Sequence, residues 1–175
     1  YMLTAQSGNT GGLTWAAAPA GITEADNWRI TANTNAGTNG YVTSNWERND
    51  TSGFSKIGTG LSESSGAFSF ATTGIYLITY HAQFLIHGGE VQVALTLDVT
   101  TNNSSYAHAC HAIGGNDGST DGIRGSASNA FLFDVTDTSN CKFKFYTDSF
   151  SSSSALVGNS SYNMTAFTSV RLGDT

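Results

Sequence analysis

The stretch of residues 75–87 constrains the fold more than any other part of the chain. Its even-numbered positions, from Tyr76 to Ile86, are all apolar or aromatic, and they share one face of an extended strand because successive side chains alternate. The odd-numbered face mixes Ile75 and Leu77 with threonine, histidine and glutamine. A strand with apolar residues on both sides needs cover on both. The pattern predicts a long strand with one face in a sandwich core and a second face covered by something else.

Short β-branched and aromatic segments, separated by clusters of Gly, Asn, Asp and Ser, recur along the chain, and sustained helical periodicity is absent. This pattern is typical of an antiparallel sandwich. The predicted strands cover residues 28–32, 41–46, 67–70, 75–87, 91–99, 106–112, 130–135, 142–147 and 162–172. The length of 175 residues fits one domain, which we place at residues 27–175. Residues 1–26, with a Gly-rich run and the only proline, form an arm or linker.

The composition excludes several classes of partner. Charged residues make up only 11% of the chain, where about 25% is usual. The net charge is −6, so we expect neither nucleic-acid binding nor attraction to an anionic membrane. No apolar run is long enough for membrane insertion. Cys110 and Cys141 allow one disulfide or two free thiols.

One motif is specific enough to suggest a family. Gly66, Phe68, Gly74 and Tyr76, followed by a strand that reaches Tyr80-His81, match the spacing Gly-x-Phe-x-x-x-x-x-Gly-x-Tyr. This segment resembles the signature of the globular head of complement component 1q (C1q). The last predicted strand, with its Phe and aliphatic ending, is similar to that family's closing strand, whereas the family's collagen stalk has no counterpart here. The resemblance spans residues 28–174, of which only residues 66–81 form a specific motif.

The resemblance implies a jelly roll of the C1q and tumour-necrosis-factor (TNF) type, assembled as a homotrimer. A subunit interface would cover the mixed second faces of residues 75–87 and 162–172, since large exposed apolar patches are rare on monomers. Cover by the N-terminal arm or a long loop is the alternative. His81 would either cluster near a threefold axis or form a hydrogen bond inside its own subunit. We predict subunit contacts at Tyr76, Ile78, Tyr80, His81, Phe84 and Phe167.

The arm carries a second resemblance, because Tyr1-Met2-Leu3-Thr4 leading to Leu13-Thr14-Trp15 is similar to linkers that precede C-terminal domains in bacteriophage fibre proteins. It implies a structural protein of the virion, bound to other virion proteins through the arm. Its role would be particle assembly or host attachment through a saccharide or protein on the host surface. The alternative is a secreted or cell-surface trimeric ligand or lectin-like module.

The linear motifs of common enzymes are absent from the sequence, so an enzyme is not expected. His108 and Cys110 share a strand face while His111 points the other way, which favours structural roles over a metal site. Loops 114–125 and 150–161 are the predicted ligand-binding surface, with Asn116, Asp117, Asp121, Phe150 and Tyr162. No cofactor is expected. Calcium in the first loop is a weaker alternative to a plain solvated turn.

Overall fold

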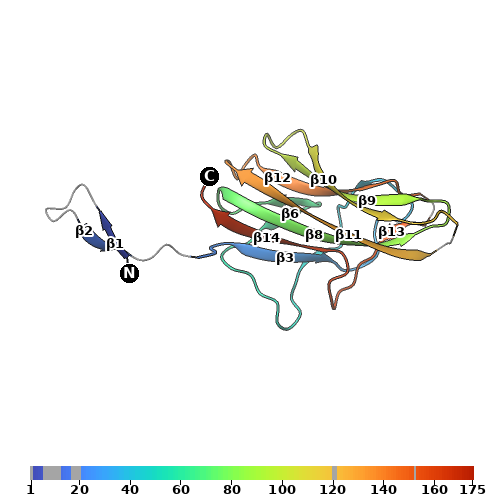
Figure 1. The fold of residues 1–175 in the computed structure, drawn as a ribbon, viewed down its shortest axis with the longest axis horizontal. Helices are drawn as coiled ribbons and strands as arrows, with labels where there is room; N and C mark the ends of the chain where they lie inside the picture. Colours follow the sequence, from blue (N-terminus) through green and yellow to red (C-terminus); the bar gives the residue numbers. More distant parts are fainter. Residues whose placement is uncertain (1, 6–12, 17–20, 120–121, 152) are drawn as a thin grey trace.

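The structure, a computed structural model, describes residues 2–5, 13–16, 21–119, 122–151 and 153–175. In these ranges every regular element is a β-strand and no α-helix occurs, which confirms the all-β prediction (Figure 1). Within the same ranges no helix is long and apolar enough to cross a membrane. Strands β1 (Met2–Ala5) and β2 (Leu13–Ala16) pair only with each other. The assignment of residues 1–26 to an arm stays a prediction.

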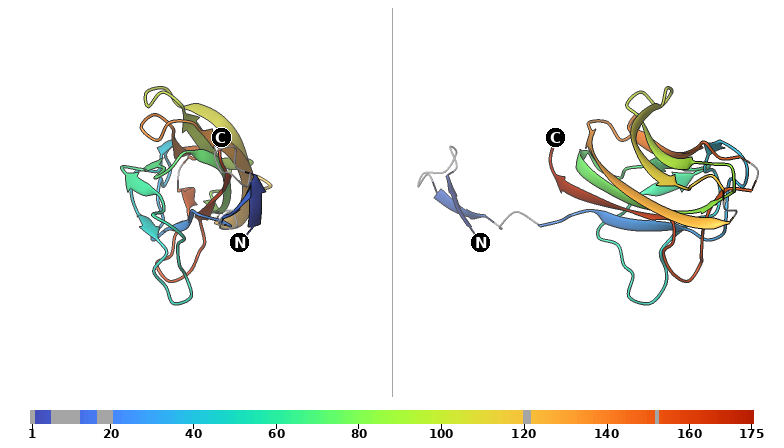
Figure 2. Two further views of the ribbon diagram at one scale, coloured as in Figure 1. Left: turned by 90° about the vertical axis from the view of Figure 1, so that its left-hand side faces the viewer. Right: turned by 45° about the vertical axis from the view of Figure 1, so that its right-hand side comes forward.

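The remaining strands form two antiparallel sheets that pack face to face (Figures 1 and 2). The first, here called the β8 sheet, has the order β11-β8-β14-β3-β5, with β13 also paired to β8. Its strands are β11 (Ile123–Val135), β8 (Gly74–Ile86), β14 (Ala166–Gly173), β3 (Ala25–Ile30), β5 (Trp46–Arg48) and β13 (Ala155–Leu156).

The second sheet, here called the β9 sheet, has the order β10-β9-β12-β7-β6, with β4 also paired to β12. Its strands are β10 (Ala107–Gly115), β9 (Gln92–Thr100), β12 (Lys142–Asp148), β7 (Ala67–Ser69), β6 (Ser62–Ser64) and β4 (Gly40–Tyr41). Non-consecutive strands lie side by side in both sheets, as a jelly roll requires.

The core lies between the two sheets and is largely aromatic. Phe68 on β7 is fully buried at its centre, stacked on Phe143 at 5.0 Å and edge-on to Phe167 at 4.7 Å between ring centroids. Every even-numbered residue of β8 from Tyr76 to Ile86 is also buried. The core therefore takes the continuous apolar face of this strand. Packed aromatic pairs of this kind contribute beyond their buried area.

The predicted strand 41–46 is wrong, because its ends belong to β4 and β5, which lie in different sheets. Strand β11 begins at Ile123, seven residues before the predicted start at residue 130. Residues 124–128 are small or polar and lack strand propensity. They nevertheless pair with β8 along its whole length, from Ile123 opposite Ile86 to Val135 opposite Gly74. Tertiary pairing overrides local preference here.

Candidate functional site

The structure corrects most of the predicted subunit contacts. Five of the six side chains are at most 4% exposed within a single chain and point into the core: Tyr76, Ile78, Tyr80, Phe84 and Phe167. They cannot contact a neighbouring subunit, because the continuous apolar face of β8 is the one that the sandwich covers. Only His81 is exposed, on the opposite side of the strand.

That opposite side is the outer surface of the β8 sheet, here called the open face. Strand pairing aligns its residues in three rows across β11, β8, β14 and β3. The first row is apolar, while the second and third consist mainly of small and polar side chains around Thr79 and His81. In register, the rows are Leu132–Leu77–Val170–Ala25, Ala130–Thr79–Thr168–Asn27 and Ser128–His81–Ala166–Arg29.

The open face is shallowly hollowed and close to neutral. A depression of about 570 Å³ lies over Thr79 and His81 and is also lined by Asn27, Ser128 and Thr168. These side chains bring hydroxyls, amides and one imidazole together. They offer hydrogen bonds and close packing, but no carboxylate or nucleophile–base pair for acid–base chemistry.

Arg29 is the last residue of the third row, and acidic residues of its own chain balance its positive charge. Its side chain is fully buried and donates to Glu47 at 2.8 Å, Asp50 at 2.8 Å and the Thr51 hydroxyl at 2.7 Å. Buried cations are tolerated when they are paired and hydrogen-bonded in this way. Arg29 therefore fixes the loop after β5 and is not available to a ligand.

The outer surface of the β9 sheet has different chemistry, built around the buried carboxylate of Asp98. The Tyr41 hydroxyl donates to it at 3.1 Å, and Nδ1 of His108 lies 2.6 Å from its other oxygen. An ionised carboxylate only accepts, so His108 donates from Nδ1 and turns Nε2 away. Burial, and then the neighbouring Asp98 carboxylate, raise the pKa of Tyr41 to about 12.

Aromatic and basic side chains surround Asp98. Lys144 Nζ lies 5.0 Å from the ring centroid of Tyr41 and 4.6 Å from that of Tyr106, both in cation–π range. Tyr146 packs edge-on against Tyr41 at 5.2 Å. The exposed ring of His111 lies 5.5 Å from that of His108. Strands β4, β9, β10 and β12, with Tyr106 just before β10, thus present a polar aromatic surface that sequence reasoning did not identify.

The residues weighed as metal ligands do not converge, and their predicted faces were wrong. A β-bulge between His108 and Cys110 places His108 and His111 together on the outer surface and turns Cys110 inward. Cys110 points toward the core, where its thiol lies 3.6 Å from the Tyr80 hydroxyl and burial raises its pKa. Both cysteines are free thiols. Within the described ranges, no three His, Cys, Asp or Glu side chains gather closely enough to hold a metal ion.

The predicted ligand loops are only partly accessible. Phe150 is 4% exposed and packs on Phe84 at 6.0 Å, so its assignment to a ligand surface is wrong: its ring completes the end of the core. Tyr162 is 55% exposed. Asp117 accepts from the Ser119 amide at 2.9 Å within a turn. The backbone N–H of Asn116 donates to the Val91 carbonyl at 3.1 Å. Asp121 lies outside the described residues.

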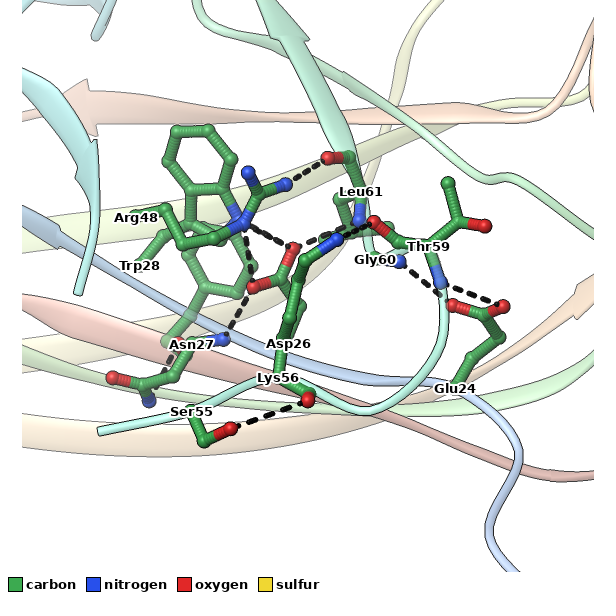
Figure 3. Close-up of polar contacts among 11 residues, drawn as sticks. Glu24, Asp26, Asn27, Trp28, Arg48, Ser55, Lys56, Thr59, Gly60 and Leu61 are labelled. Carbon is green, nitrogen blue, oxygen red and sulfur yellow. Dashed lines mark hydrogen bonds and ion pairs between the residues drawn. The ribbon is translucent and has the colours of Figure 1, made fainter. Parts of the chain in front are cut away.

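A second carboxylate cluster, shown in Figure 3, lies at the start of the β8 sheet. Asp26 accepts from Trp28 Nε1 at 2.9 Å and the Leu61 amide at 2.8 Å, and pairs with Arg48 at 3.0 Å. Glu24 accepts from the amide of Gly60 at 2.8 Å. Both carboxylates hold the 55–61 loop against β3 by accepting hydrogen bonds from its backbone amides. The two carboxylates are therefore structural, and the cavity that they line with Leu61 and Tyr76 is only about 10 Å³.

Taken together, the two antiparallel sheets, the aromatic core and the uncovered β8 surface define an all-β jelly-roll sandwich of the TNF-like type. The chain is similar to Eiger TNF from S. frugiperda, with a TM-score of 0.65 and 12% sequence identity over 89% of this chain and 96% of that one.

Murine APRIL is also similar in structure. Its structure at pH 8.0 has a TM-score of 0.57 and 12% sequence identity, over 85% of this chain and 98% of that one. Its structure at pH 5.0 has a TM-score of 0.58 and 13% identity, with the same coverage of both chains. No family model and no curated protein matches the sequence. At these identities the likeness establishes the fold alone, and the predicted jelly-roll fold of the TNF type is confirmed.

Proposed function

We propose that this chain is a non-enzymatic, homotrimeric binding module whose subunits pack through the open face of the β8 sheet. One observation carries the proposal: a row of apolar residues crosses this face, and Leu132 in it is 58% exposed. A contiguous uncovered apolar row rimmed by polar residues marks an interaction site. The number three comes from the resemblance to the C1q and TNF families.

The rest of the face suits a second copy of the same chain. Ala130, Ala166 and Ser128 are small enough to let another sheet approach closely, and the one arginine in the three rows is already neutralised by its own chain. Interface centres are depleted in charge in the same way. Self-association therefore meets no unpaired charge at the centre of this face.

The finer proposal places this head on a virion, with residues 1–26 joining it to other virion proteins and its exposed surfaces contacting a host saccharide or protein. It is supported by the resemblance of the arm and by the low charge of the chain. A secreted or cell-surface ligand with the same trimer is the alternative. Neither version includes a cofactor.

The test is the solution mass of the full chain, measured by light scattering, for the parent protein and for Thr79→Arg. We expect three times 18.3 kDa for the parent and a smaller species for the variant, because an arginine at the centre of the face would be buried without a partner. Thr101→Arg, at an exposed loop residue, is the matched control and should keep the parent mass. A monomeric parent, or a Thr79→Arg protein of unchanged mass, would refute the proposal.

A further inference from the structure

Lysine and histidine side chains gather on one surface of this acidic chain. The sequence has three lysines and four histidines and a net charge of −6. Two of the lysines, Lys142 and Lys144, and two of the histidines, His108 and His111, lie on the outer surface of the β9 sheet. Here this surface is called the Lys144 face, and it also includes Tyr41, Asp98, Tyr106 and Tyr146.

Strand register places these groups in rows. His108 and Lys144 both lie opposite Asp98, one on each side of β9. His111 and Tyr146 both lie opposite Thr96, and Tyr41 follows Tyr146 on β4. The acidic member of the face, Asp98, is only 1% exposed. The accessible part of these two rows therefore consists of cationic, imidazole and phenol groups.

The Lys144 face is also held rigid before any ligand arrives. Asp98 fixes Tyr41 and His108 through hydrogen bonds, and Thr96 bonds to His111 Nδ1 at 3.2 Å. Lys144 is confined between the rings of Tyr41 and Tyr106. Side chains that are already ordered on strands lose little entropy on binding.

We propose that the Lys144 face binds a carboxylated saccharide, such as a chain of uronic or sialic acid residues. The Lys144 ammonium supplies donors for a carboxylate, and the tyrosine rings supply flat apolar surfaces with polar edges for sugar rings. Charge complementarity favours the acidic sugar over a neutral one.

This site lies on the opposite sheet from the open face, so trimer formation leaves it accessible (Figure 2). The inference rests on the proposed binding function, but not on the trimer. It assigns to the module a ligand class and a surface different from the loops that the sequence suggested. Binding and assembly can therefore be measured separately on the same sample.

The experiment is calorimetric titration of the full chain at pH 7 with polygalacturonate and with polysialic acid, and with fully methyl-esterified polygalacturonate as the uncharged counterpart. We expect at least one acidic polymer to bind and the methyl ester to bind at least tenfold more weakly. Lys144→Gln and Tyr106→Ala should each weaken binding at least fivefold. Lys56→Gln, which removes the same charge from a loop beside the other sheet, should stay within twofold.

Three results would overturn the inference: no binding of either acidic polymer, full binding by Lys144→Gln, or equally tight binding of poly-glutamate, which would point to an acidic polypeptide instead. The melting temperature and the light-scattering mass of each variant are measured as controls for folding and assembly. A trimer that binds neither polymer would refute only this inference, and a monomer that binds would refute only the trimer.

Discussion

Replacing Asp26 by asparagine removes the one carboxylate of strand β3, which is buried and accepts several hydrogen bonds. Oδ2 accepts from Trp28 Nε1 and from the Leu61 amide, Oδ1 accepts from the Asn27 amide, and Arg48 Nε lies 3.0 and 3.1 Å from the two oxygens. An amide has a single acceptor oxygen. In its better orientation it keeps the two Oδ2 bonds and turns its NH₂ group toward the Asn27 amide and Arg48.

The cost follows from these losses. A buried donor left without its acceptor costs about 1–3 kcal/mol. Arg48 loses its counter-charge, but its side chain is 36% exposed, so water compensates and the penalty falls below the about 3–5 kcal/mol of a fully buried pair. We expect about 3 kcal/mol in total. For a chain of this length that corresponds to a fall of about 6–12 °C in melting temperature.

The assay is thermal and urea unfolding at fixed protomer concentration, because assembly would make the melting temperature concentration-dependent. Asp174→Asn is the matched control: its ion pair with Arg171 is on the surface, with the carboxylate 93% exposed, and exposed pairs contribute about 0–1 kcal/mol. If Asp26→Asn unfolds within about 1 kcal/mol of the parent, the carboxylate charge does not hold the 55–61 loop and the reasoning fails.

Two further predictions concern stability. The pKa of Tyr41 is raised from 10 to about 12 in the folded chain, by burial and then by Asp98. The unfolded state therefore ionises first, and the free energy of unfolding falls as pH rises from 10 to 12. Urea unfolding of Tyr41→Phe should show a shallower loss of stability over this range, and a slope identical to that of the parent would contradict the prediction. Gly66 has φ +78° and its added Cβ would lie 2.2 Å from the Val42 carbonyl oxygen, whereas Gly53 has φ +94° and open space. Gly66→Ala should therefore unfold at least about 2 kcal/mol more easily than Gly53→Ala, and equal urea midpoints would refute the steric argument.

The parts of the fold that sequence reasoning predicted are those with a local signature. Strands β8, β9 and β12 coincide closely with the predicted strands because each alternates apolar and polar residues, or is apolar throughout, over its own length. The first half of β11 has no such signature, since residues 124–128 are small or polar. Its strand conformation comes from β8, which is remote in sequence.

The missed polar residues share a physical cause. The Leu61 amide that donates to Asp26 is 35 residues away in the sequence. The Ser151 amide and the Ser154 hydroxyl, which donate to Glu90, are 61 and 64 residues away from it. No spacing rule connects residues so far apart. One signal was available for Asp26: it shares the core face of β3 with Trp28 and Ile30, both buried. A carboxylate in that position must find partners.

The error over β8 shows what alternation determines and what it does not. The pattern separates two faces, but it does not determine which face meets another subunit, and the predicted contacts at Tyr76 and Tyr80 lie on the even face. Inside the sandwich both hydroxyls are satisfied, Tyr76 by Thr72 at 3.0 Å and Tyr80 by the carbonyls of Leu95 and Cys110 at 3.2 and 3.1 Å. Tyrosine is a core residue wherever such acceptors exist.

Once the core is assigned, the two outer surfaces differ in a way that separates their roles. The open face combines an apolar row with small side chains and an arginine neutralised within its own chain, which suits close approach of a second sheet. The Lys144 face has exposed imidazoles beside a lysine held between two phenol rings. Burying that surface in a subunit contact would desolvate Lys144 without a free acid to pair it, since Asp98 is already bonded to Tyr41 and His108. The proposed division, with self-association through the β8 sheet and ligand binding on the β9 sheet, therefore leaves Lys144 solvated and buries only an arginine that its own chain already pairs.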